Sequence, residues 1–158
     1  MVDARSAEEE LRELVGLDCW AAGFPNNEDI QLNIGGKESI EGSPRGTTMG
    51  THILSQFESE WEIRDALTGA VLASSGSDAE TVRLVLPRLE SRIVTIAVDT
   101  SSATLAVTFA TGVELVAWAG ATARDQDEIW EALLPGNRCL VGRKEGIYFG
   151  LADESPWA

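Results

Sequence analysis

Alternation of apolar and polar side chains over residues 51–65 restricts the fold of this chain more than any other sequence feature. Odd-numbered positions carry Ile53, Phe57, Trp61 and Ile63, whereas the even-numbered positions are mostly polar or acidic. A period of two predicts a long β-strand with one buried and one solvated face.

The solvated face of this predicted strand carries Glu58, Glu60 and Glu62, which we call the Glu row. Alternate residues of a strand share a face, so these carboxylates are expected in a line, about 6.6–6.8 Å apart. Like charges in a line repel one another modestly through water, so the Glu row adds nothing to stability. It is therefore either ordinary solvated surface or a prepared contact for a partner.

Most of the remaining chain also predicts strands. Capping-box patterns followed by helical periodicity occur at the N-terminus and at the segment that begins at Ser77. Residues 127–134 fit either a helix or a strand, and we favour a helix that ends at Pro135. The other predicted strands are 19–24, 30–34, 70–74, 92–99, 104–109, 113–119, 140–142 and 147–151. The predicted fold class is α+β: a mostly antiparallel β-sheet, built as a meander of hairpins, with two or three short helices.

The length of 158 residues predicts a single domain over 1–158, because domains usually hold about 100–200 residues. Residues 35–50 are rich in Gly, Ser and Thr and predict a flexible loop, and 152–158 are expected to form a loose tail. No apolar run approaches the roughly 20 residues that a membrane-spanning helix needs. The acidic N-terminus lacks the basic start of a secretory signal, so we expect a cytoplasmic protein.

Charge excludes several classes of partner. The chain has 26 acidic and 12 basic residues and a formal net charge of −14, whereas nucleic acids and anionic membranes are held by Lys and Arg. Besides the Glu row, a second acidic group comprises Asp125, Asp127, Glu128 and Glu131. An acidic field attracts a basic protein and raises its association rate. We therefore predict a basic protein partner that contacts both groups, with solubility alone as the competing explanation.

Residues that could carry chemistry are few. His52 is the only histidine, and Cys19 and Cys139 are the only cysteines. A structural zinc site uses four ligands, usually Cys and His, and three such residues are too few. Carboxylates in a line along one strand do not converge on a calcium or magnesium ion. We therefore predict no catalytic residue, no metal and no cofactor, with both cysteines as buried, reduced thiols.

The order of elements also resembles a known class of protein. A short helix ends in the Leu-Val-Gly-Leu stretch 14–17, a tight hairpin follows the pattern Leu-x-Val-x-Phe-x-x-Gly-x-x-Leu over 105–115, and Trp130 comes later. Together these features resemble small β-rich bacterial immunity proteins encoded beside polymorphic toxins. The resemblance implies a non-enzymatic, cytoplasmic binder. Such a protein occludes the active site of a cognate toxin, commonly a basic nuclease or deaminase.

A hypothesis from another class remains open. Trp20, Trp61, Trp118 and Trp130 lie in periodic segments and are most simply core residues, but aromatic side chains also line ligand pockets. The chain would then be a small-molecule binding module or a hydrolase, with the loop 35–50 as a lid over a Trp-lined cavity. The sequence leaves open the chemistry of the partner and the oligomeric state.

Overall fold

A computed structural model describes residues 4–25, 27, 29–39 and 48–151 of the chain. Within these residues the chain forms one domain of two antiparallel β-sheets, one with six strands and one with five. The first sheet contains β1 (Cys19–Gly23), β2 (Gln31–Ser39), β3 (Thr48–Ser55), β9 (Glu128–Leu134), β10 (Arg138–Arg143) and β11 (Gly146–Leu151). The second sheet contains β4 (Glu60–Asp65), β5 (Val71–Ser74), β6 (Ile93–Asp99), β7 (Thr104–Phe109) and β8 (Val113–Trp118). These sheets confirm the prediction of a β-rich, antiparallel, single-domain fold.

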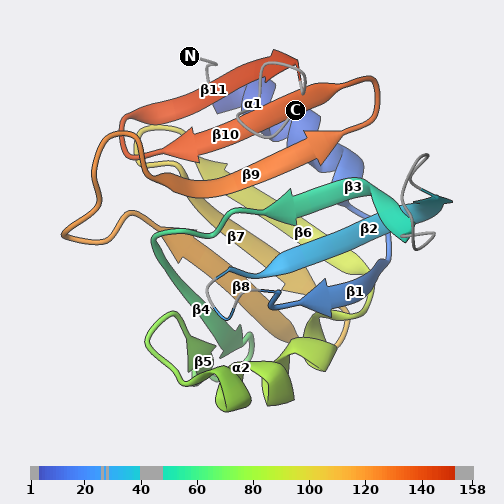
Figure 1. Cartoon of the computed structure of the whole chain (residues 1–158), viewed down its shortest axis with the longest axis vertical. Coiled ribbons are helices and arrows are strands. Elements are labelled where there is room, and N and C mark those ends of the chain that lie inside the picture. Colours follow the sequence, from blue (N-terminus) through green and yellow to red (C-terminus); the bar gives the residue numbers. More distant parts are fainter. Residues whose placement is uncertain (1–3, 26, 28, 40–47, 152–158) are drawn as a thin grey trace.

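The two sheets draw on the chain in different ways. The second sheet has the strand order β5-β4-β8-β7-β6, so its strands come from one continuous stretch. The first sheet has the order β1-β2-β3-β9-β10-β11, so an N-terminal and a C-terminal group of strands meet where β3 pairs with β9. That pairing sets Ser55 opposite Glu131 and Ile53 opposite Leu133. Figure 1 shows the first sheet in front of the second.

The hydrophobic core lies between the sheets. Its largest fully buried side chains are Trp61 on β4 and Trp130 on β9. The indole N–H of Trp130 donates to the carbonyl oxygen of Ala103, in the turn between β6 and β7, at 2.7 Å. Gly142 on β10 pairs with Trp130, and a Cβ at this glycine would come to 2.4 Å from the indole ring. The missing side chain at Gly142 therefore makes room for Trp130.

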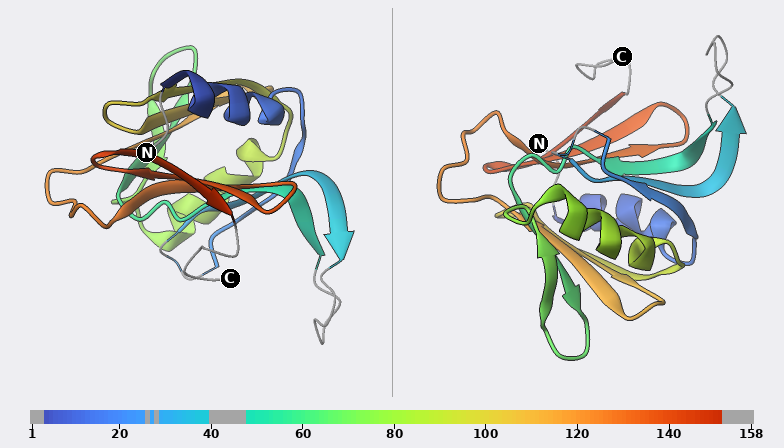
Figure 2. Two further views of the ribbon diagram at one scale, coloured as in Figure 1. Left: turned by 90° about the horizontal axis from the view of Figure 1, so that it is seen from above. Right: turned by 60° about the horizontal axis from the view of Figure 1, so that its bottom comes forward.

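Two short α-helices, each continued by a 3-10 helix, pack beside the sheets (Figure 2). They are α1 (Ala4–Leu11) with η1 (Arg12–Leu14), and α2 (Ala79–Val85) with η2 (Leu86–Leu89). The first helix packs against β6, and Arg138 of β10 forms ion pairs with Glu10 and Glu13. The second helix packs against β5, and η2 packs against β1. The helices thus cover parts of the core that the two sheets leave open.

The N-cap of α2 is Asp78, one residue later than the capping box at Ser77 predicts. The Asp78 carboxylate accepts a hydrogen bond from the N–H of Thr81 at 2.8 Å. The hydroxyl oxygen of Ser77 instead accepts from the N–H of Ser74 at 3.0 Å, within the preceding turn. Asp and Ser cap helices about equally well, so the local sequence alone does not separate the two positions.

The single long strand predicted over 51–65 is wrong. The chain leaves the first sheet after β3, crosses through residues 56–59, and enters the second sheet at Glu60. Gln56 has a left-handed φ of 59°, which turns the chain away from the line of β3. Phe57 is buried within the crossover, so the alternation of apolar and polar residues continues without a break. Alternation of apolar and polar residues therefore does not distinguish one long strand from two strands joined by a crossover.

The helix favoured over 127–134 is also wrong, because Glu128–Leu134 forms β9. Trp130 and Ala132 share the face that packs in the core, and Ile129, where the register with β10 shifts, is buried in the same core. Glu131 on the other face is buried as well. Burial of both faces removes the alternation that identifies a strand, which leaves strand and helix patterns hard to separate.

Within the flexible loop predicted over 35–50, the described residues 35–39 and 48–50 are strand, which contradicts the prediction for those positions. β2 runs on to Ser39 and β3 begins at Thr48. The intervening residues 40–47, like the predicted tail 152–158, lie outside the described residues. In the described part of the chain, no helix is long and apolar enough to cross a membrane.

Candidate functional site: an acidic cluster at the crossover

The crossover between the sheets brings together acidic residues that are far apart in the sequence. The N–H of Glu58, in the crossover 56–59, donates to the carbonyl oxygen of Glu128 at 3.2 Å. This bond joins the Glu row to the second acidic group. Carboxyl groups from three segments influence one another here, and we call them the acidic cluster: Asp29, Glu58, Asp127, Glu128 and Glu131.

Local hydrogen bonds hold the segments that carry the acidic cluster. The hydroxyl oxygen of Ser59 accepts from the N–H of Gly120 at 2.8 Å, which ties the crossover to the chain after β8. Asp127 accepts from the N–H of Arg124 at 2.9 Å and pairs with its guanidinium at 3.2 Å. The bond from the Arg124 N–H is the largest cause of the lowered pKa of Asp127. Asp127 is therefore ionised at neutral pH and closes the turn before β9.

Glu128 and Glu131 are buried, at 6% and 0% exposure, although the sequence predicts them as surface contacts. Burial is the largest cause that raises the pKa of Glu128, to about 8. The charge of Glu131, a hydrogen bond between the two carboxyl groups and the charge of Glu58 raise it further, while Arg143, 3.9 Å away, opposes them. Glu128 is therefore mostly protonated at neutral pH and donates to Glu131.

Other polar side chains surround this carboxyl pair on the outer face of the first sheet. Ser55 lies directly opposite Glu131 in the pairing of β3 and β9. The thiol of Cys139 donates to Glu131 at 3.4 Å. The buried atoms Ser55 Oγ, Glu128 Oε2 and Arg143 Nε have no hydrogen-bond partner among the described residues. Sequence reasoning missed Ser55 and Arg143 because they reach the site only through strand pairing.

Glu58, in the crossover, is the most exposed member of the acidic cluster. The other members are half-buried or buried. The pKa of Glu58 is raised by partial burial first, and then by the charges of Asp29, Asp127 and Glu131. Arg143 acts in the opposite direction and is the smallest of these influences. The shift in pKa therefore reports a net negative potential at Glu58.

The Glu row is divided between the crossover and β4. Glu62 on the outer face of β4 pairs with Arg64 at 2.7 Å. Glu60 on the same face accepts from the hydroxyl of Ser75, also at 2.7 Å. Asp125 is exposed in the segment before β9. The structure thus gathers some of the predicted contact residues into the acidic cluster, and the others lie outside it.

A hollow of about 430 Å³ opens beside Glu58. Phe24, Phe57 and Trp61 form its aromatic wall, and the rings of Phe24 and Trp61 meet edge to face with centroids 6.3 Å apart. Its polar lining comprises Asn27, Asp29, Glu58, Ser59, Ser75 and Ser77. Acidic groups beside aromatic faces favour a cationic ligand, since both attract positive charge.

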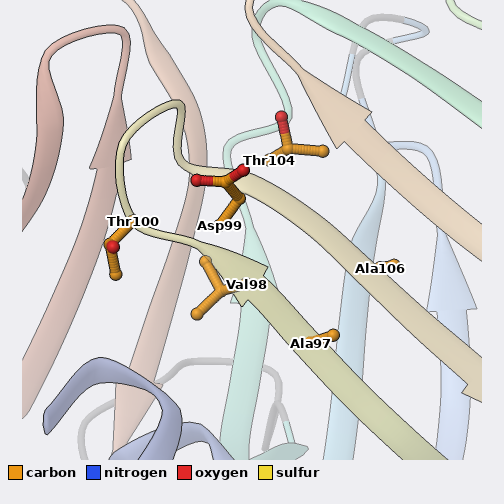
Figure 3. Close-up of a pocket in the computed structure, with 6 residues that line it drawn as sticks. All are labelled: Ala97, Val98, Asp99, Thr100, Thr104 and Ala106. Carbon is orange, nitrogen blue, oxygen red and sulfur yellow. The ribbon is translucent and has the colours of Figure 1, made fainter. Parts of the chain in front are cut away.

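A second hollow, of about 530 Å³, lies at the turn between β6 and β7 (Figure 3). Asp99 and Thr104 pair there at the ends of the two strands. The Asp99 carboxylate accepts from the N–H and the hydroxyl of Ser101, at 2.9 and 2.7 Å, and these bonds lower its pKa. The charge of Asp99 therefore stabilises its own turn, and the other lining residues carry no charge.

Of the four tryptophans expected in the core, Trp61 and Trp130 are fully buried. Trp20 and Trp118 are half-buried, each beneath a basic side chain. Trp61 is the one that lines the hollow beside Glu58. The aromatic wall of that hollow thus combines one tryptophan with two phenylalanines, and the remaining tryptophans serve packing.

The residues considered for catalysis are engaged in local contacts. His52 forms a 2.8 Å hydrogen bond with Thr51 through Nδ1, and its Nε2 lies 3.4 Å from Glu13. Cys19 and Cys139 are buried free thiols, as predicted, and burial raises the pKa of each to about 12. A protonated thiol is a poor nucleophile. Among the described ranges, no group of three or more His, Cys, Asp or Glu is placed to hold a metal ion.

No protein-family model matches the chain, and neither does a curated protein sequence or a solved structure. Its function is therefore argued from the chemistry of the acidic cluster and the hollow beside it.

Proposed function

We propose that this chain is a cytoplasmic, non-enzymatic binding protein of the immunity type, which docks a basic toxin and occludes its active site. The observation that carries the proposal is the hydrogen bond from Glu58 to Glu128, because it gathers two acidic segments at one point. The toxin class, a nuclease or a deaminase, comes from the resemblance to immunity proteins.

Electrostatics supports a docking role for the crossover. Carboxylates that raise one another's pKa form a negative field that their nearby arginines do not cancel. Such a field accelerates the encounter with a basic protein and penalises acidic competitors. We assign the direct contacts to the exposed acids Glu58, Glu60 and Asp125, which a partner can reach without disturbing the sheets.

The buried acids have a different part in this proposal. Glu131 and protonated Glu128 are inside the fold, where their carboxyl groups bond to each other. Glu128 also positions the crossover, because its backbone carbonyl oxygen accepts from the N–H of Glu58. A docked protein then contacts them only through the exposed residues that they support.

The experiment begins with the protein encoded beside the gene for this chain. We expect its expression to arrest bacterial growth, co-expression of this chain to restore growth, and the two purified proteins to form a complex. A neighbouring protein that is harmless, or that forms no complex with this chain, would overturn the proposal.

Association kinetics test the assigned surface. The triple variant Glu58→Gln, Glu60→Gln, Asp125→Asn should lower the association rate at low salt by roughly tenfold. The loss should shrink as salt rises, because exposed charges are screened over about 8–10 Å at ordinary ionic strength. The matched control makes the same change in charge on other surfaces, at Glu8, Glu80 and Glu145, and should leave the rate almost unchanged. Equal effects of both variants would show that net charge, and not this surface, steers the partner.

The competing hypothesis, a small-molecule binding module, is favoured by one observation: the hollow beside Glu58 has an aromatic wall. Thermal shift with a panel of uncharged aromatic compounds tests it. A compound that raises the melting temperature in wild type and fails to do so in Phe57→Leu would support the module. If no compound in the panel does this, the hollow is not a site for uncharged aromatic ligands.

A further inference from the structure

We propose that the hollow beside Glu58 receives one arginine side chain of the docked partner, with its guanidinium between Asp29 and Glu58. This inference rests on the proposed function and deepens it, because it names the partner residue that anchors the complex. The charge around the hollow, its aromatic wall and the hydrogen-bond donors at it each support the assignment.

The first support is the placement of charge around the hollow. Asp29 comes from the segment before β2 and Glu58 from the crossover, so two independent parts of the chain supply carboxyl groups to one space. The charges of Asp29, Asp127 and Glu131 all act on Glu58 in the same direction. In the described part of the chain, no ion pair neutralises the Glu58 carboxylate. A cation that enters the hollow therefore meets a carboxylate that forms no ion pair within the described residues.

The second support is the aromatic wall. Phe24 and Trp61 stand edge to face at the hollow, and the guanidinium carbon of Arg83 lies 5.8 Å from the centroid of the Phe24 ring. Arg83 also donates to the side-chain oxygen of Asn27, one of the lining residues. The Phe24 ring thus already contacts one guanidinium within this chain, although Arg83 does not itself line the hollow. Planar guanidinium groups stack on aromatic rings and bind carboxylates through two parallel bonds, which an ammonium group cannot do.

The third support is a polar group that the fold leaves unsatisfied. Trp61 lines the hollow at 1% exposure, and its indole N–H has no hydrogen-bond partner among the described residues. The hydroxyl oxygens of Ser59 and Ser77 at the hollow already accept backbone bonds, but each hydroxyl keeps a hydrogen to donate. A peptide segment that carries the arginine offers carbonyl oxygens to the hydroxyls of Ser59 and Ser77, whereas the Trp61 N–H lies beneath the surface and reports on the hollow from within the fold. An isolated metal ion or an apolar ligand offers no carbonyl oxygen.

The test uses a small probe and the intact protein. N-acetyl-L-arginine amide is titrated into 15N-labelled protein, and the assigned indole N–H resonance of Trp61 is followed. We expect a saturable shift with the arginine probe, and a much weaker one with N-acetyl-L-citrulline amide, which has the same shape without the charge. The lysine probe should bind several-fold more weakly than arginine. Equal binding of citrulline or of lysine would overturn the assignment to a guanidinium.

Variants locate the probe. Glu58→Gln should raise the dissociation constant of the arginine probe by at least about tenfold, since it removes a charge-assisted bond. Glu58 is exposed, so this change leaves the core intact. Glu62→Gln is the matched control, because Glu62 is already paired with Arg64 on β4, and it should bind the probe like wild type. An unchanged constant in Glu58→Gln would overturn the proposal.

Two outcomes separate this inference from the proposed function. If the toxin complex forms while the arginine probe fails to bind, the hollow is not the anchor site and the immunity-type function stands. If the probe binds at the hollow while no complex forms with the neighbouring protein, the guanidinium site is supported and the immunity-type function is contradicted.

Discussion

The indole N–H of Trp130 in the first sheet donates to the carbonyl oxygen of Ala103, in the turn that joins β6 and β7 of the second sheet, at 2.7 Å. Both residues are fully buried, so this bond is made away from water. Apolar contacts are non-directional, whereas a buried hydrogen bond fixes two groups at a defined distance and angle. The pair therefore sets the position of one sheet relative to the other.

Trp130→Phe should lower the free energy of unfolding by about 2–4 kcal/mol, since it leaves the Ala103 carbonyl unsatisfied and opens a small cavity. Urea unfolding measures the loss. Trp20→Phe is the control, because the Trp20 indole N–H has no partner among the described residues, and it should cost clearly less. Equal losses would contradict a role for the bond between the sheets.

Gly142→Ala should destabilise the protein by about 1–3 kcal/mol, because the new Cβ would come to 2.4 Å from the Trp130 indole. Gly23→Ala on β1 of the same sheet is the control, since nothing lies within 4 Å of its added Cβ. We expect the control to unfold close to wild type in urea. A stable Gly142→Ala variant would show that the indole can move aside.

The raised pKa of Glu128 predicts that stability falls as the pH rises. The folded protein keeps a proton that the unfolded chain releases near pH 4.5, so this stabilisation is complete below that pH and is lost as the pH rises through about 8. The slope reaches at most about 1.4 kcal/mol per pH unit. In Glu128→Gln the amide stays neutral and can still donate to Glu131. Urea unfolding across this range should give a flatter curve for the variant, whereas Glu62→Gln should follow wild type; parallel curves for all three would contradict the prediction.

Asp78→Ala should weaken α2, and Asp78→Asn should retain most of its stability, because Asn is also an effective N-cap. The bond from the Thr81 N–H lowers the pKa of Asp78, so its stabilisation is present at neutral pH and is lost as the pH falls through that lowered pKa. We expect the alanine variant to melt about 2–4 °C lower at neutral pH. Hydrogen exchange at the Thr81 amide should accelerate with it. An alanine variant with unchanged exchange would contradict the capping role.

Local elements of this fold could be predicted from the sequence. The hairpins of β1 with β2 and of β7 with β8 follow from short alternating segments and turn residues such as Gly112. The two α-helices follow from helical periodicity, but their predicted starts are wrong: α1 begins at Ala4, so Ser6 of the N-terminal capping box lies inside it, and α2 is capped by Asp78. In each case the interactions that decide the structure lie within a few residues of one another, which is the range that a sequence pattern reports.

The arrangement of these elements could not be predicted in the same way. The alternation over 51–65 continues through the crossover because Phe57 is buried there. The sequence pattern therefore does not show where the chain changes from one sheet to the other. Glu131 occupies an outward-facing position of β9, where a glutamate is normally solvated, yet it is fully buried. The sequence identifies each acidic residue of the site. That these residues lie close together depends on the pairing of β3 with β9, which no local pattern predicts.

The split origin of the first sheet has a consequence for synthesis on the ribosome. Strands β4–β8 are contiguous in the chain and emerge together, so the second sheet can complete its pairing while β9–β11 are still being translated. Before β9 is synthesised, the edge of β3 that pairs with it has unpaired backbone N–H and C=O groups. These groups can pair with an exposed strand of another chain. Strands β9–β11, which begin only at Glu128, therefore complete the first sheet, and a nascent chain that stalls before them exposes an unpaired strand edge.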